Sequence, residues 1–171
     1  QPGEELAARK IPAARRRGSE LRPLTGVTAI QPGPADVAVS CGNESFTAGN
    51  VVVTAGAWTT TLLRDLGVPL EVWRKVQLWY DDSTCDYHMD AGCPVFGFHT
   101  GVAEFVYGVP TINDRGLKVA EHTGRHVVAA PDAVDRSLHP GDHQRVETLL
   151  RPYLTKASWR LKSHSVCLYT M

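Results

Sequence analysis

The pattern of apolar positions in the first fifty residues predicts one helical segment followed by short strands. The segment Glu4–Arg17 is rich in Ala, Leu and Arg, which favours a helix, but Pro12 lacks a backbone N–H and is expected to break or kink it. Apolar and β-branched runs then predict strands at Leu24–Ile30, at Val37–Ser40 and from Phe46 onward, with Gln31–Pro34 as a turn.

A continuous β-branched run follows at Val51–Ala55. It has no polar alternation, which is typical of a strand buried on both faces. It leads into the turn Gly56–Trp58, and Thr59–Leu66 then has helical spacing. A buried strand, a glycine turn and a helix in this order indicate a nucleotide-binding layer, because glycine lets the backbone approach a ligand closely.

Beyond a boundary near Leu66–Leu70 the pattern becomes that of a sheet. Apolar and aromatic runs separated by Gly, Pro and Asp predict strands at Val72–Tyr80, Val95–His99, Glu104–Val109, Leu117–His122 and Ser163–Tyr169. One helix is predicted at Asp142–Arg151, before Pro152. The expected fold class is therefore α/β, or mixed α+β, with a largely antiparallel sheet in the second part.

Composition narrows the class of protein. The 171 residues include 18 Lys and Arg and 18 Asp and Glu, so no net charge would attract nucleic acid or an anionic membrane. No apolar run is long enough to span a bilayer, and no leader segment opens the sequence. Four cysteines without a CxxC pair predict reduced thiols. We therefore expect a soluble, cytoplasmic protein without nucleic-acid or membrane partners.

Two other kinds of chemistry have weak support. His122 and His126, like His139 and His143, stand four residues apart, but glycine interrupts both pairs, so we expect no metal site. No GxSxG nucleophile motif or GxxxxGK phosphate loop is present. A hydrolase using Cys167 stays open, although that residue lies in a predicted strand, whereas reactive thiols more often sit at helix N-termini.

The most informative group of residues surrounds a predicted hairpin. Tyr107 and Lys118 flank a turn rich in Pro, Asn, Asp and Gly, so they can fall on facing strands. Lys118, Ala120 and His122 are at even spacing and would share one face of a strand, with space above the small Ala120. Spacing alone favours an ordinary exposed polar face of a sheet over a functional site.

Several segments together resemble the monomeric sarcosine oxidase and N-methyl-tryptophan oxidase family of FAD-dependent amine oxidases. They occur in family order over most of the chain: Thr25–Val27, Val51–Trp58, Pro69 with Trp73–Val76, Tyr107–Pro110, Gly116–Lys118 with His122, and Val166–Thr170. Each segment alone is weak evidence for this resemblance, but together the segments are specific. The resemblance implies a Rossmann-type FAD-binding domain and a substrate domain.

The resemblance also implies roles for individual residues. Cys167 matches the cysteine bonded covalently to FAD, and Tyr169 lies in the same cofactor-binding segment. Lys118 matches a lysine near flavin N5, where a cation stabilises negative charge developing as oxygen takes electrons. His122 and Tyr107 match residues of the substrate cavity. The remaining cofactor-binding positions are Val27, at the adenosine half of FAD, and Gly56, Ala57 and Trp58, on the flavin side.

The implied reaction oxidises the C–N bond of a secondary amine or N-methyl amino acid to an imine, while molecular oxygen becomes hydrogen peroxide. Arg74-Lys75 replaces the more usual Arg-Gln of the family, which leaves the substrate open.

The family's opening GxGxxG motif is absent, so we expect a partial copy of the enzyme, inactive alone. Its expected parts are an FAD-binding remnant at residues 1–68, a substrate domain at 69–162 and a return strand at 163–171. The alternative is a non-catalytic interaction module, monomeric or associating through exposed strand edges.

Overall fold

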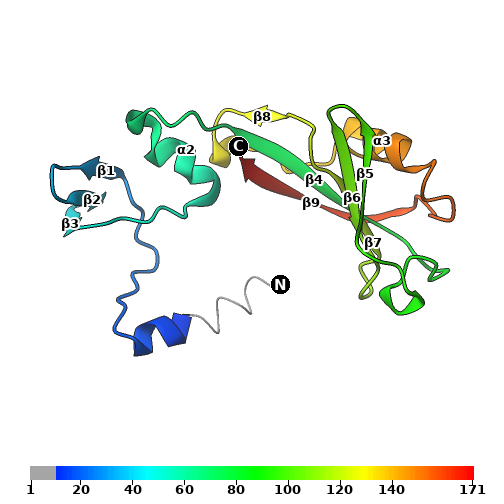
Figure 1. Cartoon of the computed structure of the whole chain (residues 1–171), viewed down its shortest axis with the longest axis horizontal. Coiled ribbons are helices and arrows are strands. Elements are labelled where there is room, and N and C mark those ends of the chain that lie inside the picture. Colours follow the sequence, from blue (N-terminus) through cyan, green and yellow to red (C-terminus); the bar gives the residue numbers. More distant parts are fainter. Residues whose placement is uncertain (1–10) are drawn as a thin grey trace. The chain divides into compact units, whose positions relative to one another are not determined.

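The computed structural model describes residues 11–171, which form two compact units dividing between Val52 and Val53. Figure 1 follows the chain through both units. Each unit is described by itself. Among the described residues, no helix is long and apolar enough to cross a membrane.

The first unit contains a three-stranded antiparallel meander. Its strands are β1 (Ala29–Pro32), β2 (Val37–Cys41) and β3 (Glu44–Ala48). A hydrogen bond from the Gly33 N–H to the Asp36 carbonyl closes the first turn at 2.7 Å. The three predicted strands are confirmed, but the first begins at Ala29, so the expected segment Leu24–Ile30 is extended for only its last two residues.

A helical segment precedes the meander, and Pro12 does not act there as predicted. Residues 11–16 are all helical, so the expected break at Pro12 is wrong within the described residues. Proline is compatible with helical φ angles, and its missing N–H breaks only a bond to a residue four positions earlier. The first part of the predicted segment, Glu4–Lys10, lies outside the described residues.

The predicted buried strand at Val51–Ala55 is also wrong. These residues have no regular secondary structure, and the Val52 side chain is 86% exposed. A strand exists only where a neighbour supplies hydrogen bonds along its edge, and no described strand pairs with this run. The β-branched composition therefore identified an extended segment but not a sheet.

Short helices follow this run at the beginning of the second unit. The expected Gly56–Trp58 turn is the 3₁₀ helix η1 (Gly56–Trp58), where Gly56 has a φ of +55°. The predicted helix at Thr59–Leu66 is divided into α2 (Thr59–Leu62) and the 3₁₀ helix η2 (Arg64–Leu66). Two further 3₁₀ turns are η3 (Met89–Ala91) and η4 (Pro131–Ala133).

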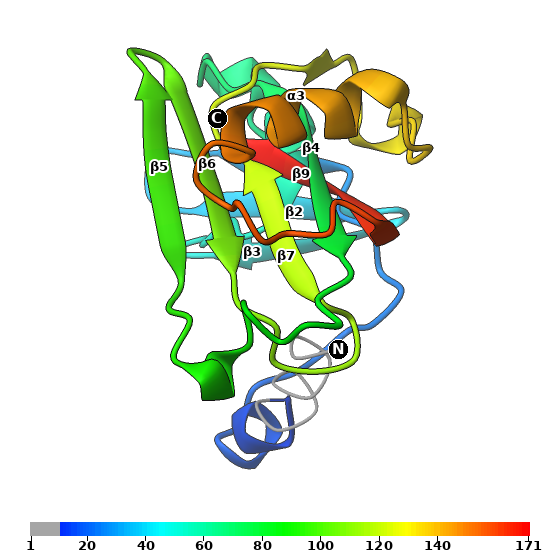
Figure 2. The same ribbon diagram turned by 90° about the vertical axis from the view of Figure 1, so that its right-hand side faces the viewer.

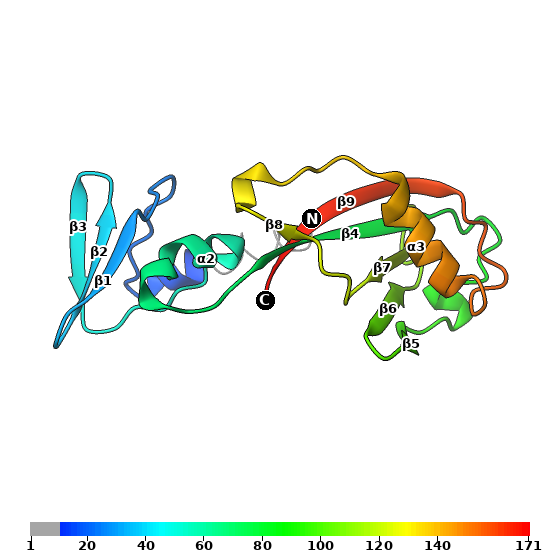
Figure 3. The same cartoon turned by 90° about the horizontal axis from the view of Figure 1, so that it is seen from above.

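A six-stranded antiparallel sheet forms the body of the second unit. Its strands are β4 (Val72–Tyr80), β5 (Phe96–Gly101), β6 (Glu104–Val109), β7 (Leu117–Glu121), β8 (Val127–Val128) and β9 (Leu161–Thr170). Strand β4 is central: β7 and β8 pair with successive parts of one edge, and β9 pairs along the other. Figure 2 shows β5, β6 and β7 side by side, and Figure 3 shows β4 and β9 along their length. The predicted mixed fold with a largely antiparallel sheet is confirmed.

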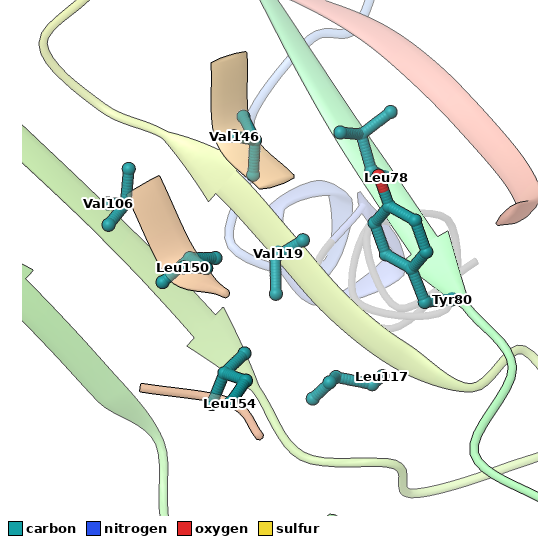
Figure 4. Close-up of a cluster of buried hydrophobic side chains, with 8 residues drawn as sticks. All are labelled: Leu78, Tyr80, Val106, Leu117, Val119, Val146, Leu150 and Leu154. Carbon is teal, nitrogen blue, oxygen red and sulfur yellow. The ribbon is translucent and has the colours of Figure 1, made fainter. Parts of the chain in front are cut away.

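Helix α3 (Pro140–Leu150) covers one face of this sheet. The buried side chains are Leu78, Tyr80, Val106, Leu117, Val119, Val146, Leu150 and Leu154, drawn in Figure 4. They alternate along the strands with side chains that point to the opposite face. The Tyr80 hydroxyl donates to Glu147 on α3 at 2.9 Å, which satisfies a polar group at the edge of the core.

A buried ion pair fixes the first turn of α3 to β4. Arg74, whose side chain is 2% exposed, binds both carboxylate oxygens of Asp142 at 2.7 and 2.9 Å. Asp142 also accepts the His139 N–H at 2.8 Å in a capping box. Burial alone would raise the pKa of Asp142, but these hydrogen bonds outweigh it and hold the pKa below its usual value.

Candidate functional site

The sheet face turned away from α3 carries the polar and aromatic side chains that the sequence singled out. Side chains directly opposite in an antiparallel register share a face. The pairs Trp79 with Lys118, and Lys75 with Cys167, therefore lie on this face. We define the site face by Tyr107, Lys118, His122, Cys167 and Tyr169.

Strands β6 and β7 form the predicted hairpin side of the site face. Tyr107 is opposite Ala120, and Val109 is opposite Lys118, so Tyr107 and Lys118 are diagonal neighbours. Ala120 separates Lys118 from His122 along the chain, as the spacing predicted. Its small side chain leaves the space above the strand to its larger neighbours.

Strand β9 contributes Cys167 and Tyr169 from the other side of β4. Cys167 is half-buried and reduced. Tyr107 and Tyr169 lie close together on the site face, although their strands are separated by others in the sheet. Burial chiefly raises the pKa of Tyr107, and the neighbouring Tyr169 phenol and the charge of a Cys167 thiolate raise it further.

Lys118 is a half-buried cation near Cys167. Burial lowers the pKa of its ammonium, a Cys167 thiolate opposes this effect, and Arg115 lowers the pKa further. Lys118 Nζ lies 5.5 Å from the centroid of the Trp79 ring, and the Arg115 guanidinium lies 3.9 Å from the same ring. Among residues 11–171, no carboxylate forms a salt bridge with Lys118, so its charge is available to a ligand on this face.

His122 is exposed immediately after β7 and lies between two aromatic rings. Its ring centroid is 5.9 Å from that of Phe105 and 5.5 Å from that of Tyr169. Its N–H donates to the Phe105 carbonyl at 2.8 Å, which continues the pairing of β6 with β7 by one residue. The imidazole is therefore held at the edge of the site face between strands β6 and β9.

The 3₁₀ helix η1 contacts β9, the strand that carries Cys167 and Tyr169. Ala57 is buried at 5% exposure, and Trp58 is half-exposed with its indole N–H donating to Asp132 at 3.2 Å. The structure thus brings Gly56, Ala57 and Trp58 to the same strand as two site-face residues. Val27 belongs to the first unit, where it is 39% exposed.

The paired histidines have separate surroundings. His139 Nε2 lies 2.9 Å from Asp135, and His143 Nδ1 lies 3.2 Å from Glu147. In the part of the chain that the structure describes, no group of three or more His, Cys, Asp and Glu side chains is arranged to hold a metal ion.

Sequence reasoning missed three residues that shape this face. Trp79 carries the two cations Arg115 and Lys118, and Phe105 supports His122. Lys75 was noted only as a departure from a family pattern. The even spacing of Trp73, Lys75, Gln77 and Trp79 was the available signal, because alternate residues of β4 must share one face.

Comparison with known proteins identifies relatives of the chain. No family model matches the chain. The monomeric sarcosine oxidase of Bacillus sp. strain B-0618 is 31% identical over 162 residues, covering 92% of this chain and 41% of that enzyme. The human peroxisomal sarcosine oxidase is 32% identical, with 92% and 42% covered. The N-methyl-L-tryptophan oxidase of Citrobacter koseri is 30% identical over 62% of this chain and 27% of its own length.

Solved structures show the same fold. NikD, an amino acid oxidase essential for nikkomycin biosynthesis, gives a TM-score of 0.64 at 19% identity over 92% of this chain and 42% of its own. L-proline dehydrogenase from P. horikoshii gives 0.61 at 16% identity over 91% and 40%. The fold is therefore that of amino acid oxidases and dehydrogenases.

The chain is a homologue of the sarcosine oxidases and N-methyl-L-tryptophan oxidases, so the resemblance in its motifs is confirmed. It spans about two fifths of the length of the sarcosine oxidases that it matches.

Proposed function

We propose that this chain is part of an FAD-dependent oxidoreductase that oxidises the C–N bond of a secondary amine or N-methyl amino acid. The amine would lose two electrons and two protons to give an imine, and molecular oxygen would gain them to give hydrogen peroxide. The observation that carries the proposal is the gathering of Tyr107, Lys118, His122, Cys167 and Tyr169 on one sheet face.

The side chains of the site face fit a flavin. A half-buried thiol at Cys167 can form a covalent thioether, and the rings of Tyr169, Tyr107 and His122 provide flat apolar surface beside it. The Lys118 ammonium has no ion-pair partner among the described residues, which suits a ligand that gains negative charge. FAD, when bound, would supply the two-electron acceptor that no amino-acid side chain provides.

Lys118 would stabilise negative charge during the reaction with oxygen. Its ammonium is partly removed from water, where a fixed charge acts more strongly than in solvent. Trp79 orients it through a cation–π contact. We therefore assign Lys118 to oxygen activation rather than to amine binding.

His122 and the tyrosine pair would bound the substrate side. The His122 ring is exposed beside Tyr169, so it can meet a bound amine while the Phe105 carbonyl holds its backbone. Tyr107 and Tyr169 lie together on this side and add aromatic surface without a charge.

We extend the proposal to the organisation of the chain. Residues 1–68 would contribute to FAD binding, with Val27 beside the adenosine half and Gly56, Ala57 and Trp58 beside the flavin. Residues 69–162 would form the substrate domain, and residues 163–171 would return toward the flavin with Cys167. The contact of η1 with β9 supports the part of this assignment that lies within the second unit.

The test is an oxygen-consumption assay on the intact protein with sarcosine and other secondary amines as probes. We expect amine-dependent consumption of oxygen and stoichiometric hydrogen peroxide, and a rise in KM for His122→Ala. A matched control is His164→Ala, because His164 is exposed on β9 outside the site face. A colourless protein without amine-dependent oxygen consumption would contradict the proposal and would favour a non-catalytic interaction module.

A further inference from the structure

Lys75 is a second cation on the site face, and it is more deeply buried than Lys118. Its side chain is on central strand β4 and the residue is only 5% exposed. In the register of β4 with β9 it lies directly opposite Cys167. It therefore occupies the middle of the candidate site.

The Lys75 ammonium donates to two backbone carbonyls of one turn. Nζ lies 2.6 Å from the His122 oxygen and also binds the Gly124 oxygen. These carbonyls belong to the segment that joins β7 to β8, just beyond the last residue of β7. The His122 N–H is held by the Phe105 carbonyl, and Lys75 supplies the donor to the carbonyls of His122 and Gly124.

Burial makes this arrangement costly. The pKa of Lys75 is lowered, chiefly by burial, and Glu121 only partly offsets that effect. A buried ammonium without an ion pair is tolerated when its hydrogen bonds are specific. The two carbonyl bonds are the specific interactions that the structure gives it.

The same ammonium contacts the aromatic part of the site face. Nζ is 5.1 Å from the Trp73 ring centroid and 5.6 Å from that of Tyr169. The Tyr169 ring is in turn 5.5 Å from the His122 ring. Lys75 therefore contacts both the backbone of His122 and the ring against which His122 lies.

We propose that Lys75 is a positioning residue that holds the His122 imidazole against Tyr169 by anchoring the 122–124 turn. The role in amine binding rests on the proposed function, whereas the anchoring of the turn does not. We assign Lys75 no contact with substrate, because the residue is only 5% exposed and its ammonium is bonded to two backbone carbonyls.

The test compares Lys75→Met, which removes the donors and the charge, with Lys75→Gln, which keeps two N–H donors without the charge. Lys162→Met is the matched control, because the Lys162 ammonium also donates to a backbone carbonyl, that of Asp114, but is exposed. Hydrogen exchange of the His122 amide, which donates to the Phe105 carbonyl, reports the anchoring in the intact protein without any need for activity when followed by mass spectrometry.

We expect Lys75→Met to speed exchange at the His122 amide by about tenfold, as loss of hydrogen bonds from a charged donor implies. Lys75→Gln should recover most of the protection, and Lys162→Met should leave it unchanged. Equal exchange in Lys75→Met and Lys162→Met would overturn the proposal, as would failure of Lys75→Gln to restore protection. If Lys75→Met does not fold, Lys75→Gln should still protect the His122 amide nearly as well as Lys162→Met does, and much faster exchange in Lys75→Gln alone would overturn the proposal.

Steady-state kinetics give the second readout. Lys75→Met should raise the amine KM by about tenfold and change kcat much less. This rise should disappear when His122→Ala is already present, since Lys75 acts through His122. A full additional rise in the double variant would contradict positioning. A protein that oxidises no amine would refute the proposed function, while the exchange result would still judge the anchoring role of Lys75.

Discussion

The Tyr107 phenol on β6 lies beside the Tyr169 phenol on β9, across strands that separate them in the sheet, and Tyr169 raises the pKa of Tyr107. This contact links the hairpin that carries Lys118 to the strand that carries Cys167. Residues distant in sequence therefore meet on one face of the sheet.

We predict that Tyr169→Phe lowers the pKa of Tyr107 toward the usual value of about 10. The neighbouring Tyr169 phenol favours the neutral phenol of Tyr107, so removing its hydroxyl makes deprotonation of Tyr107 easier, although burial, the larger cause, keeps the pKa raised. Phenolate absorbance measured against pH checks this shift. Tyr153→Phe is the control, because Tyr153 is 49% exposed and should leave the Tyr107 titration unchanged.

Lys118→Met should slow the reaction of reduced enzyme with oxygen far more than the reduction of enzyme by amine. Only the oxygen reaction develops negative charge beside the ammonium, so only that transition state loses a stabilising interaction. Stopped-flow measurement of the two half-reactions separates these steps. Equal slowing of both would assign Lys118 a general structural role instead.

Asp142→Asn should remove an acid-sensitive part of the stability. The folded-state pKa of Asp142 is depressed, so its contribution is present above the unfolded value of about 4 and is lost as pH falls through the lower folded pKa. The difference in unfolding free energy between wild type and Asp142→Asn should therefore shrink below about pH 4. Denaturant unfolding across this range measures it, with the exposed Asp65→Asn as control. A difference that does not change with pH would mean that the ion pair with Arg74 contributes nothing.

Leu150→Ala should destabilise the second unit by about 2–5 kcal/mol. Leu150 is 0% exposed where α3 packs on the sheet, and truncation leaves a cavity there. Leu66→Ala, at a residue that is 45% exposed, should change stability by less than about 0.5 kcal/mol. Similar losses for the two variants in denaturant unfolding would contradict the assignment of the core.

The strands of the second unit were predictable because turn residues mark their ends. Strands β4 and β6 begin and end where the apolar pattern placed them. The predicted strand at Val51–Ala55 is wrong because composition describes a residue's preference for extended backbone but does not supply the neighbouring strand. The predicted helix break at Pro12 is wrong because proline is tolerated in a helix wherever its missing N–H costs little.

Residue spacing along the sequence predicts part of the candidate site but not all of it. Lys118 and His122 share a face because even spacing on a strand requires it. The approach of Tyr107 to Tyr169 depends on the register of β9 with β4, which are about ninety residues apart in the chain. The contact of Lys75 with the 122–124 turn depends on the pairing of β4 with β7 and β8. No local pattern encodes that register.

The covalent bond between Cys167 and the flavin tests the central claim most directly. Mass spectrometry of the acid-precipitated, digested intact protein should find the peptide containing Cys167 heavier by the mass of the flavin cofactor. Cys167→Ala should lose all acid-stable flavin, while Cys93→Ala should keep it, since Cys93 lies outside the site face. Acid-stable flavin in Cys167→Ala, or an unmodified Cys167 in active wild-type protein, would contradict the assignment.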